Sequence, residues 1–386
     1  MQTGRPLDPL DVVRLLIGFD TTSRGSNLEL IDFAQDLLES AGGRCRRTLD
    51  AAGAKANLFA SFGPDAPGGY VLSGHTDVVP VDGQAWSSYP FHAEVRGDKL
   101  YGRGACDMKG FIGVALSLLP EIARAKLARP IHFALSYDEE VGCVGVRGLL
   151  DDLKAADIRP ALAIVGEPTE MKVVGAHKAG AVLHTHCHGR EGHSSAPEKG
   201  ANAVMMAGEF VKMLDDVWHD LRADEDPRFD PPHTTVQANM ISGGSAVNIL
   251  GRDATVTWEY RALPDRDAQR IVDAVIARAD ATILPKYRVR ALEAAFETKL
   301  HAAYPGLVMD EASPAVALAR EISGTNRVEA VAYGTEAGHF QRAGIPAVIC
   351  GPGSIEQAHK ADEFVALSEL VGCEAFLRKV IARAEA

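Results

Sequence analysis

The 386-residue sequence lacks several features that define whole classes of protein. It has no run of about 18 apolar residues, the length that a membrane-spanning helix needs. Its six cysteines are scattered and form no CxxC pair, so we expect reduced thiols rather than a disulfide framework or a cysteine-type zinc site. No cluster of lysine and arginine offsets the net charge of −12, which argues against nucleic-acid and membrane partners.

The N-terminal segment also lacks the pattern of a targeting sequence. Charged residues interrupt the only apolar stretch among the first 20 residues, so we expect neither a signal peptide nor an anchor. Together with reduced cysteines, this predicts a cytoplasmic protein. Hydrophobic residues make up 46% of the chain and charged residues 24%, which leaves room for two domains and a large core.

Short apolar segments alternate with amphipathic ones in both outer parts of the chain. We expect strands at residues 44–49, 57–62, 70–72, 131–136, 161–165, 328–333 and 347–350. We expect helices from residues 9 and 28, and over residues 111–119, 144–153 and 335–343. This alternation predicts an α/β domain whose sheet is covered on both faces. Residues 178–287, with expected helices at 201–218 and 266–279, instead follow a β-α-β-β-α order with a core pattern of their own, which predicts a smaller inserted α+β domain.

The first chemical pattern ends the strand at residues 70–72. His75 and Asp77 are two positions apart, so their side chains share one side of an extended backbone. An imidazole that binds a metal usually donates its other N–H to a carboxylate or carbonyl, so Asp77 is the expected partner of His75. A lone His-x-Asp is a weak signal, and further ligands are needed to support a metal site.

A glycine-rich turn, GRGACDMKG, follows at residues 102–110 and leads into a helix. Glycine lets the backbone approach a site closely, and Asp107 lies at the point of approach. The alternative is a loop that cradles a phosphate. The turn lacks the GxxxxGK[ST] and GxGxxG spacings of such loops, however, and its carboxylate would repel a phosphate.

Carboxylates also follow two later strands. Glu139 and Glu140 come after the strand at 131–136, and Glu167 follows the next one. A single carboxylate there is usually a solvated turn or a helix cap. Several in succession favour a site, because ligands gather at the carboxyl ends of strands in an α/β sheet. Neighbours on an extended chain point apart, so one of Glu139 and Glu140 can bind metal while the other faces the water.

His359 follows a late strand and a glycine-rich turn, as a last ligand should. With it, the candidate ligands comprise two imidazoles and three carboxylates: His75, Asp107, Glu140, Glu167 and His359. This set suits two zinc-like ions that each take one histidine and one terminal carboxylate and share an aspartate. Two such ions polarise a carbonyl and generate hydroxide at neutral pH, so the sequence predicts amide hydrolysis.

Other histidines are less informative. His184, His186 and His188 alternate on one expected strand and could imitate a metal triad, although an interface or a partly exposed strand face is the simpler interpretation. His193 lies in an expected loop of the inserted domain, where a histidine that contacts substrate would lie.

Taken in order along the chain, the motifs HTDVVP, YGRGACDMKG, SYDEEVG, GEPT and GHSSAP, with His359, form a recognisable set. They resemble the motifs of the di-zinc family that contains acetylornithine deacetylase, succinyl-diaminopimelate desuccinylase, aminoacylase and related carboxypeptidases. The segment GPGSIEQAH at residues 351–359 is most similar to the acetylornithine deacetylase branch. The resemblance implies a zinc-exopeptidase-like catalytic domain with a mixed sheet, formed by residues 1–177 and 288–386. It also implies that residues 178–287 form a dimerisation domain.

The resemblance implies an activity as well, namely removal of the acetyl group from N-acetyl-L-ornithine to give L-ornithine and acetate for arginine biosynthesis. The alternative is hydrolysis of another N-acyl amino acid. Two divalent metal ions are implied, with zinc favoured over cobalt. A non-catalytic relative should have lost a metal ligand or the general base. This chain keeps all five candidate ligands and Glu139, the candidate base. A cysteine hydrolase using Cys106 is disfavoured, because the surrounding acidic groups would raise the pKa of its thiol.

Roles for the metal ligands follow from the resemblance. Asp107 would bridge the two metals. His75 and Glu167 would complete one metal position, and Glu140 and His359 would complete the other. The peptide bond after Asp107 is expected to be cis.

Further roles follow in the same way. Glu139 would be the general base that deprotonates the attacking water and then protonates the leaving amine. Asp77 would orient His75. In a homodimer formed through the inserted domain, His193 would reach the partner's site and steady the oxyanion. Arg261, assisted by Asn248, would hold the substrate α-carboxylate, since a guanidinium suits that group.

One substrate contact is our own hypothesis rather than an implication of the family. Glu336 follows the expected strand at 328–333, and its carboxylate could meet the cationic side chain of the substrate.

Overall fold

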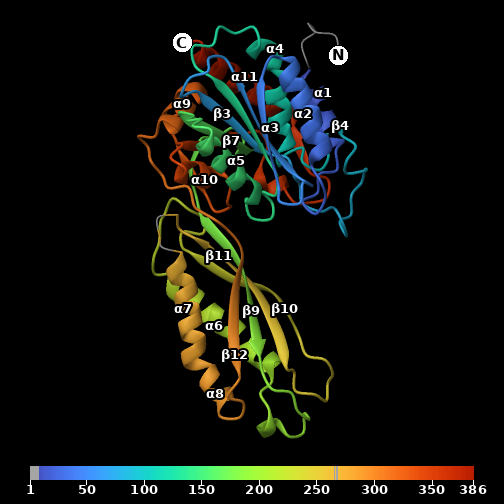
Figure 1. The fold of residues 1–386 in the computed structure, drawn as a ribbon, viewed down its shortest axis with the longest axis vertical. Coiled ribbons are helices and arrows are strands. Elements are labelled where there is room, and N and C mark those ends of the chain that lie inside the picture. Colours follow the sequence, from blue (N-terminus) through green and yellow to red (C-terminus); the bar gives the residue numbers. More distant parts are fainter. Residues whose placement is uncertain (1–7, 265, 267) are drawn as a thin grey trace. The chain divides into compact units, whose positions relative to one another are not determined.

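The computed structural model describes residues 8–264, 266 and 268–386 (Figure 1). The chain divides into two compact units. The first comprises residues up to Ala176, Leu307–Ala330 and Thr335–Ala386, and the second comprises His177–Gly306 and Val331–Gly334. The second unit therefore extends beyond residue 287, the expected boundary. The reason is a strand that the sequence pattern did not reveal, β12 (Ala295–Tyr304), which pairs with β9 (Ala179–His188) of the second unit.

A mixed eight-stranded sheet, in the order β1-β2-β6-β3-β7-β14-β8-β13, forms the centre of the first unit. Its strands are β1 (Arg44–Leu49), β2 (Ala56–Phe62), β3 (Tyr70–His75), β6 (Ile131–Ser136), β7 (Leu162–Pro168), β8 (Val174–His177), β13 (Glu329–Val331) and β14 (Ala347–Gly351). The neighbours β6, β3, β7 and β14 run parallel. Their carboxyl ends therefore meet at one edge of the sheet, the usual place for a site in an α/β fold.

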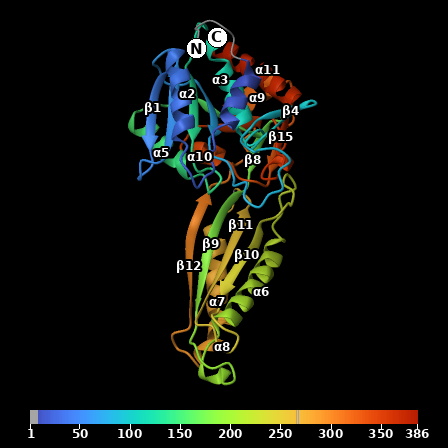
Figure 2. The ribbon, with the colours of Figure 1, turned by 90° about the vertical axis from the view of Figure 1, so that its right-hand side faces the viewer.

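Helices cover both faces of this sheet, as the alternating pattern predicted (Figures 1 and 2). Five of them share one hydrophobic core: α1 (Pro9–Ile17), α2 (Leu28–Ser40), α3 (Lys109–Ser117), α9 (Pro314–Ser323) and α11 (Leu367–Ala384). On the other face, α5 (Val144–Ala155) packs on β2 and β6, and α10 (Ala337–Arg342) packs on β7 and β14. Every residue of α3 is buried, which fixes the position of the Asp107 turn that precedes it.

Smaller elements complete the first unit. A separate antiparallel sheet has the order β15-β5-β4, with bounds β4 (Glu94–Arg96), β5 (Lys99–Tyr101) and β15 (Phe364–Ala366). The short helix α4 (Leu119–Ile122) follows α3. Asp8 caps α1, because its side chain accepts a hydrogen bond from Leu10 N. Asn27 precedes α2 but does not cap it, since its amide instead bonds to Ala56 and Thr76.

The second unit is a four-stranded antiparallel sheet, β10-β11-β9-β12, covered by helices (Figure 2). The remaining bounds are β9 (Ala179–His188), β10 (Thr235–Gly243), β11 (Asp253–Ala262), α6 (Ala203–Leu221), α7 (Gln269–Thr282) and α8 (Leu284–Arg288). Leu183 and Cys187 of β9 enter the core with both long helices, so His184, His186 and His188 lie on the opposite face of the sheet. The expected helix at 266–279 includes residue 267, which lies outside the described residues.

Over residues 8–264, 266 and 268–386, none of the helices combines the length and apolar character needed to cross a bilayer. The expectation that the N-terminus carries no signal peptide or anchor also concerns residues 1–7, which lie outside the described part of the chain.

Candidate metal centre

The parallel strands bring residues from distant parts of the sequence to one edge of the sheet. His75 ends β3 and is paired in register with the last residue of β6. Glu139 and Glu140 lie in the turn after β6, and Glu167 lies near the end of β7. His359 follows β14 in a loop. The sheet topology thus places all of them at the same edge.

Asp107 lies between the two imidazoles. Its Oδ1 is 3.0 Å from His75 Nε2, and its Oδ2 is 3.2 Å from His359 Nε2. The residue is 5% exposed. The peptide bond from Asp107 to Met108 is cis, as the family resemblance implied. One carboxylate thus faces both histidines with different oxygens, which is the arrangement required of a bridging ligand.

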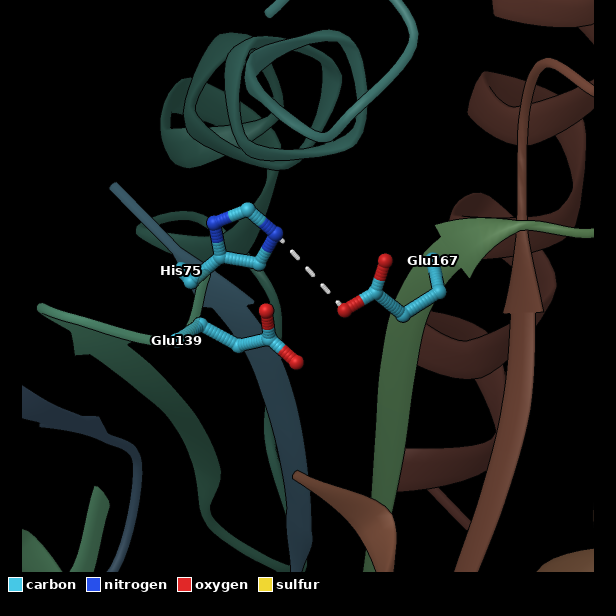
Figure 3. Close-up of side chains that lie close together, drawn as sticks. All are labelled: His75, Glu139 and Glu167. Atoms are coloured by element: carbon cyan, nitrogen blue, oxygen red, sulfur yellow. Dashed lines mark ion pairs between the residues drawn. The ribbon is translucent and has the colours of Figure 1, made fainter. Parts of the chain in front are cut away.

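Each imidazole has a second carboxylate nearby. Glu167 Oε1 is 3.7 Å from His75 Nε2 (Figure 3). Glu140 Oε2 is 3.0 Å from His359 Nε2. The five side chains therefore divide into two halves that share Asp107, each with one histidine and one terminal carboxylate.

His75 is held in a defined orientation. Its Nδ1 donates a hydrogen bond to the main-chain oxygen of Asp77 at 3.0 Å, whereas the Asp77 carboxylate is 3.6 Å away. This bond fixes Nε2 as the nitrogen that faces Asp107 and Glu167 and that would bind a metal. Asp77 does contact His75, but mainly through its carbonyl rather than through its carboxylate.

The Asp77 carboxylate has another set of partners, which sequence reasoning missed. It accepts hydrogen bonds from Ser23 Oγ at 2.7 Å, from Glu139 N at 3.0 Å and from Glu140 N at 3.3 Å. It therefore fixes the backbone of the turn that presents both glutamates. No local pattern signals the Ser23 contact, because 54 residues separate the partners in sequence.

Glu139 and Glu140 both reach the cluster. Ligand atoms of His75, Glu139 and Glu167 lie within 4.8 Å of one another (Figure 3). The same holds for the ligand atoms of His75, Asp107 and Glu140. The expectation that the two glutamates point apart assumed an extended chain, but this segment turns, with Gly142 N and Cys143 N both donating to Glu139 O. Glu139 also accepts a hydrogen bond from Cys143 Sγ at 3.3 Å.

The cluster concentrates negative charge where water is scarce. Burial raises the pKa of Glu139 and of Glu167 well above the usual range of a carboxyl group, and it raises that of Glu140 to about 7. Hydrogen bonds from His359 and His75 overcome the effect of burial and lower the pKa of Asp107. Four carboxyl groups thus surround two imidazoles, and divalent cations would stabilise their ionised forms.

These residues fit a pair of divalent metal ions. Within the described residues, the buried Glu167 Oε1 accepts no hydrogen bond, so a lone pair faces the cluster without a donor. Imidazole nitrogens with carboxylate oxygens are a donor set that zinc and similar ions prefer. His75, Asp107 and Glu167 would hold one ion, and Asp107, Glu140 and His359 the other.

Cys106 does not have the surroundings of a nucleophile. Burial, together with the Glu363 and Asp107 carboxylates, raises the pKa of its thiol. Its Sγ donates to Ser354 O at 3.2 Å. A thiolate at this position is therefore strongly disfavoured, which agrees with the interpretation from sequence.

Glu336 precedes α10 and is 1% exposed. Its Oε1 accepts a hydrogen bond from Ser136 Oγ at 2.5 Å, and Ser73 Oγ donates to its Oε2 at 3.5 Å. Burial raises the pKa of Glu336 to about 7. The carboxyl group thus packs against side chains of β6 and β3, and its contact with a substrate cation stays a prediction.

The other three candidates belong to the second unit. The His193 and Asn248 loops are adjacent, because Ser194 N donates to Asn248 O at 3.0 Å. Arg261 lies near the far end of β11, where it bonds to Glu259 Oε2 at 3.1 Å and to Tyr304 OH. The ten residues of β11 span roughly 30 Å between these places. One copy of this unit therefore does not bring Arg261 together with His193 and Asn248.

Comparison with known proteins yields a consistent set of relatives. The model of peptidase family M20/M25/M40 matches residues 71–383. Acetylornithine deacetylase of Myxococcus xanthus is 37% identical over 377 residues, which cover 95% of each chain. Further relatives of that name, including the one from Pasteurella multocida, are 32–34% identical over most of the chain.

Solved structures share the fold. A family M20 metallo-carboxypeptidase of Sulfolobus solfataricus superposes with a TM-score of 0.75 at 16% identity, covering 98% of this chain and 99% of that one. The YXEP protein of Bacillus subtilis, a dinuclear metal-binding peptidase of family M20, gives a TM-score of 0.66 at 15% identity and covers 97% and 98%.

Proposed function

The chain belongs to peptidase family M20/M25/M40, and from that premise we propose that it hydrolyses N-acetyl-L-ornithine to L-ornithine and acetate. The observation that carries this proposal is the cluster of two imidazoles and four carboxyl groups, arranged in two halves around Asp107. The choice of substrate is supported by relatives named acetylornithine deacetylase, which align with most of the chain.

The carboxyl groups of the cluster have different proposed roles. Two divalent ions held here would polarise the acyl carbonyl and lower the pKa of the attacking water. Glu139 takes the proton of that water and later delivers it to the nitrogen of the leaving ornithine. The raised pKa of Glu139 suits both steps, because a general base must also be able to hold the proton.

Substrate recognition is assigned to the second unit. Arg261 holds the α-carboxylate of the substrate through a bidentate hydrogen bond, with Asn248 assisting. Arg261 is already oriented by Glu259 and Tyr304, so little freedom is lost when a carboxylate binds.

We propose that the protein is a homodimer in which His193 and Asn248 act in the partner's site. Since β11 separates these residues from Arg261 within one chain, two copies of the unit are required to use all three. The edge strand β10 offers a surface for pairing, because Met240 and Ile241 are 69% and 56% exposed. At the partner's site, His193 donates a hydrogen bond to the developing oxyanion.

Zinc is the proposed native metal, with cobalt as a functional substitute, because a nitrogen and oxygen donor set of this size suits both. The proposed cellular role is arginine biosynthesis in the cytoplasm. The six free cysteines support that location, since a reducing compartment keeps thiols unpaired.

A panel of substrates tests the proposed activity. The purified, metal-loaded protein is assayed with N-acetyl-L-ornithine, N-acetyl-L-methionine and N-succinyl-LL-diaminopimelate. We expect the highest kcat/KM for N-acetyl-L-ornithine. A higher kcat/KM for either of the other two would rule out N-acetyl-L-ornithine as the preferred substrate. The proposed amide hydrolysis would stand, with another N-acyl amino acid as its substrate.

A further inference from the structure

Glu363 lies four positions after His359 and is 1% exposed, yet the proposed chemistry gives it no role. Both of its oxygens accept hydrogen bonds from the turn that presents Asp107. Oε1 accepts from Cys106 N at 2.8 Å and from Asp107 N at 3.1 Å, and Oε2 accepts from Gly104 N at 3.1 Å. One buried carboxylate therefore holds three backbone N–H groups of this turn.

Arg103 supplies the balancing charge. It is also 1% exposed, and its Nη1 is 2.7 Å from Glu363 Oε2. The same Nη1 donates to Lys360 O at 3.3 Å, and the guanidinium lies 5.0 Å from the centre of the Trp86 ring. A buried ion pair with this many additional partners fixes geometry, whereas its net effect on stability can be small.

Gln84 connects Arg103 to the backbone of His359. Arg103 Nη2 donates to Gln84 Oε1 at 2.6 Å, and Gln84 Nε2 donates to the main-chain oxygen of His359 at 2.8 Å. The backbone of Asp107 is thereby linked to the backbone of His359 through three side chains. Both linked residues belong to the same half of the proposed metal centre.

We propose that Glu363, Arg103 and Gln84 are positioning residues that hold Asp107 and His359 in their metal-binding arrangement before any metal arrives. This inference rests on the proposed metal centre and deepens it. The five ligands carry several negative charges that repel one another, so without metal the loops tend to separate. The three positioning side chains oppose that separation through contacts to backbone atoms, and so lower the reorganisation that metal binding requires.

The test uses Glu363→Gln in the metal-free full-length protein. An amide places an NH₂ group among N–H donors and leaves the Arg103 guanidinium without its counter-charge, so the turn should lose its fixed position. Titration with zinc, followed by calorimetry, should show affinity lowered by roughly 10- to 100-fold, the range measured for residues that orient metal ligands. The absorption spectrum of the cobalt-loaded variant should change as well, because the ligand geometry differs.

Asp226→Asn is the matched control. Asp226 also accepts hydrogen bonds from a backbone N–H and a guanidinium, both of Arg228, but it lies in the second unit. This variant should bind zinc with wild-type affinity. Equal losses of affinity in the two variants would mean that general destabilisation explains both, and would overturn the proposal.

Gln84→Ala keeps the proposal testable if Glu363→Gln does not fold. It removes the hydrogen bonds of Gln84 to His359 O, Arg103 and Trp86 but leaves the contacts of Glu363 to the Asp107 turn in place. It should lower the affinity for one of the two ions while leaving the other unchanged. Wild-type affinity for both ions in either folded variant would overturn the proposal. Absence of zinc binding by the wild-type protein would instead refute the metal centre itself, so the two failures are distinguishable.

Discussion

At the scale of single residues, the neighbouring glutamates Glu139 and Glu140 share a turn and are both partly buried, but they differ in their contacts. Glu140 Oε2 is 3.0 Å from His359 Nε2, whereas Glu139 accepts a hydrogen bond from Cys143 and has His75 and Glu167 as its neighbours. The first arrangement suits a ligand, and the second suits a base that handles a proton. The two substitutions to glutamine should therefore fail in different ways.

We expect Glu139→Gln to lower kcat by about 10²- to 10⁴-fold, because general acid–base catalysis contributes that much. Its zinc content should stay at the wild-type level. Glu140→Gln should instead lose affinity for one ion and regain part of its activity at high zinc concentration. Metal analysis and steady-state kinetics on both variants provide the measurement, and equal zinc loss in the two would contradict the assignment.

Glu336 allows a second prediction at this scale. If its carboxylate meets the substrate's ammonium group, Glu336→Gln should raise KM for N-acetyl-L-ornithine about 10-fold, the loss expected for one charged hydrogen bond. KM for the neutral N-acetyl-L-methionine should not change. A parallel change for both substrates would show that Glu336 acts through Ser136 and Ser73, and that the substrate contact is absent.

The candidate metal ligands and the candidate base could be identified from the sequence, but their contacts could not. His75, Glu140 and Glu167 stand out because each follows an apolar strand. The second function of Asp77, holding the Glu139 and Glu140 backbone, depends on a turn whose shape no local pattern specifies. The Glu363 contacts depend on two loops that meet only in the folded chain.

At the scale of elements, the long buried strands and the largely exposed β1 were predictable, whereas β12 was missed. The segments of β3, β6 and β14 are buried on both faces and are mostly apolar. In β12, Glu297, Lys299 and His301 alternate with less polar residues on one exposed face, so the strand resembles a polar loop. The position of the second domain boundary was missed for the same reason.

The pairing of β2 with β6 carries a prediction about acid stability. His132 of β6 is 4% exposed, donates Nε2–H to Gly68 O at 3.2 Å and accepts at Nδ1 from Ser61 Oγ at 2.8 Å. It is therefore neutral in the fold, and burial lowers its pKa to about 4. The unfolded chain, with an ordinary histidine pKa near 6.5, binds more protons between these values. This contribution to stability is complete above about pH 6.5 and is lost as the pH falls toward 4.

The loss amounts to about 2 to 3 kcal/mol of unfolding free energy between pH 7 and pH 4. Urea unfolding at several pH values measures it in the wild-type protein and in His132→Gln, which cannot be protonated. The variant should show a shallower decline on acidification. His92→Gln, which changes an exposed histidine, is the control and should follow the wild-type curve. Identical slopes for His132→Gln and the wild type would contradict the assignment of a buried neutral imidazole.

At the scale of the whole molecule, the account requires a second copy of the chain. The first unit contains all proposed metal ligands and the base, while Arg261, His193 and Asn248 belong to the second unit. The length of β11 prevents one copy from uniting the last three. The sequence pattern indicated an inserted domain, but it could not indicate this separation. The sequence of β11 predicts a strand, but it does not predict which residues lie near the two ends of that strand.

Mixing two inactive variants tests whether His193 acts in the partner's site. Glu139→Gln retains His193, and His193→Ala retains Glu139, so a mixed dimer contains one complete site. After subunit exchange, half of the dimers are mixed and half of their sites are complete, giving about a quarter of wild-type activity. Each variant alone is the control and should remain inactive. If mixing restores no activity while light scattering confirms exchange, His193 does not act across subunits.

Hydrolysis of N-acetyl-L-ornithine before chelation, after chelation and after zinc is restored tests the proposed metal-dependent chemistry. Removal of metal should abolish activity, about two zinc ions per chain should restore it, and Glu139→Gln should stay inactive under all three conditions. Full activity of the chelated protein, with metal analysis confirming its absence, would contradict the account.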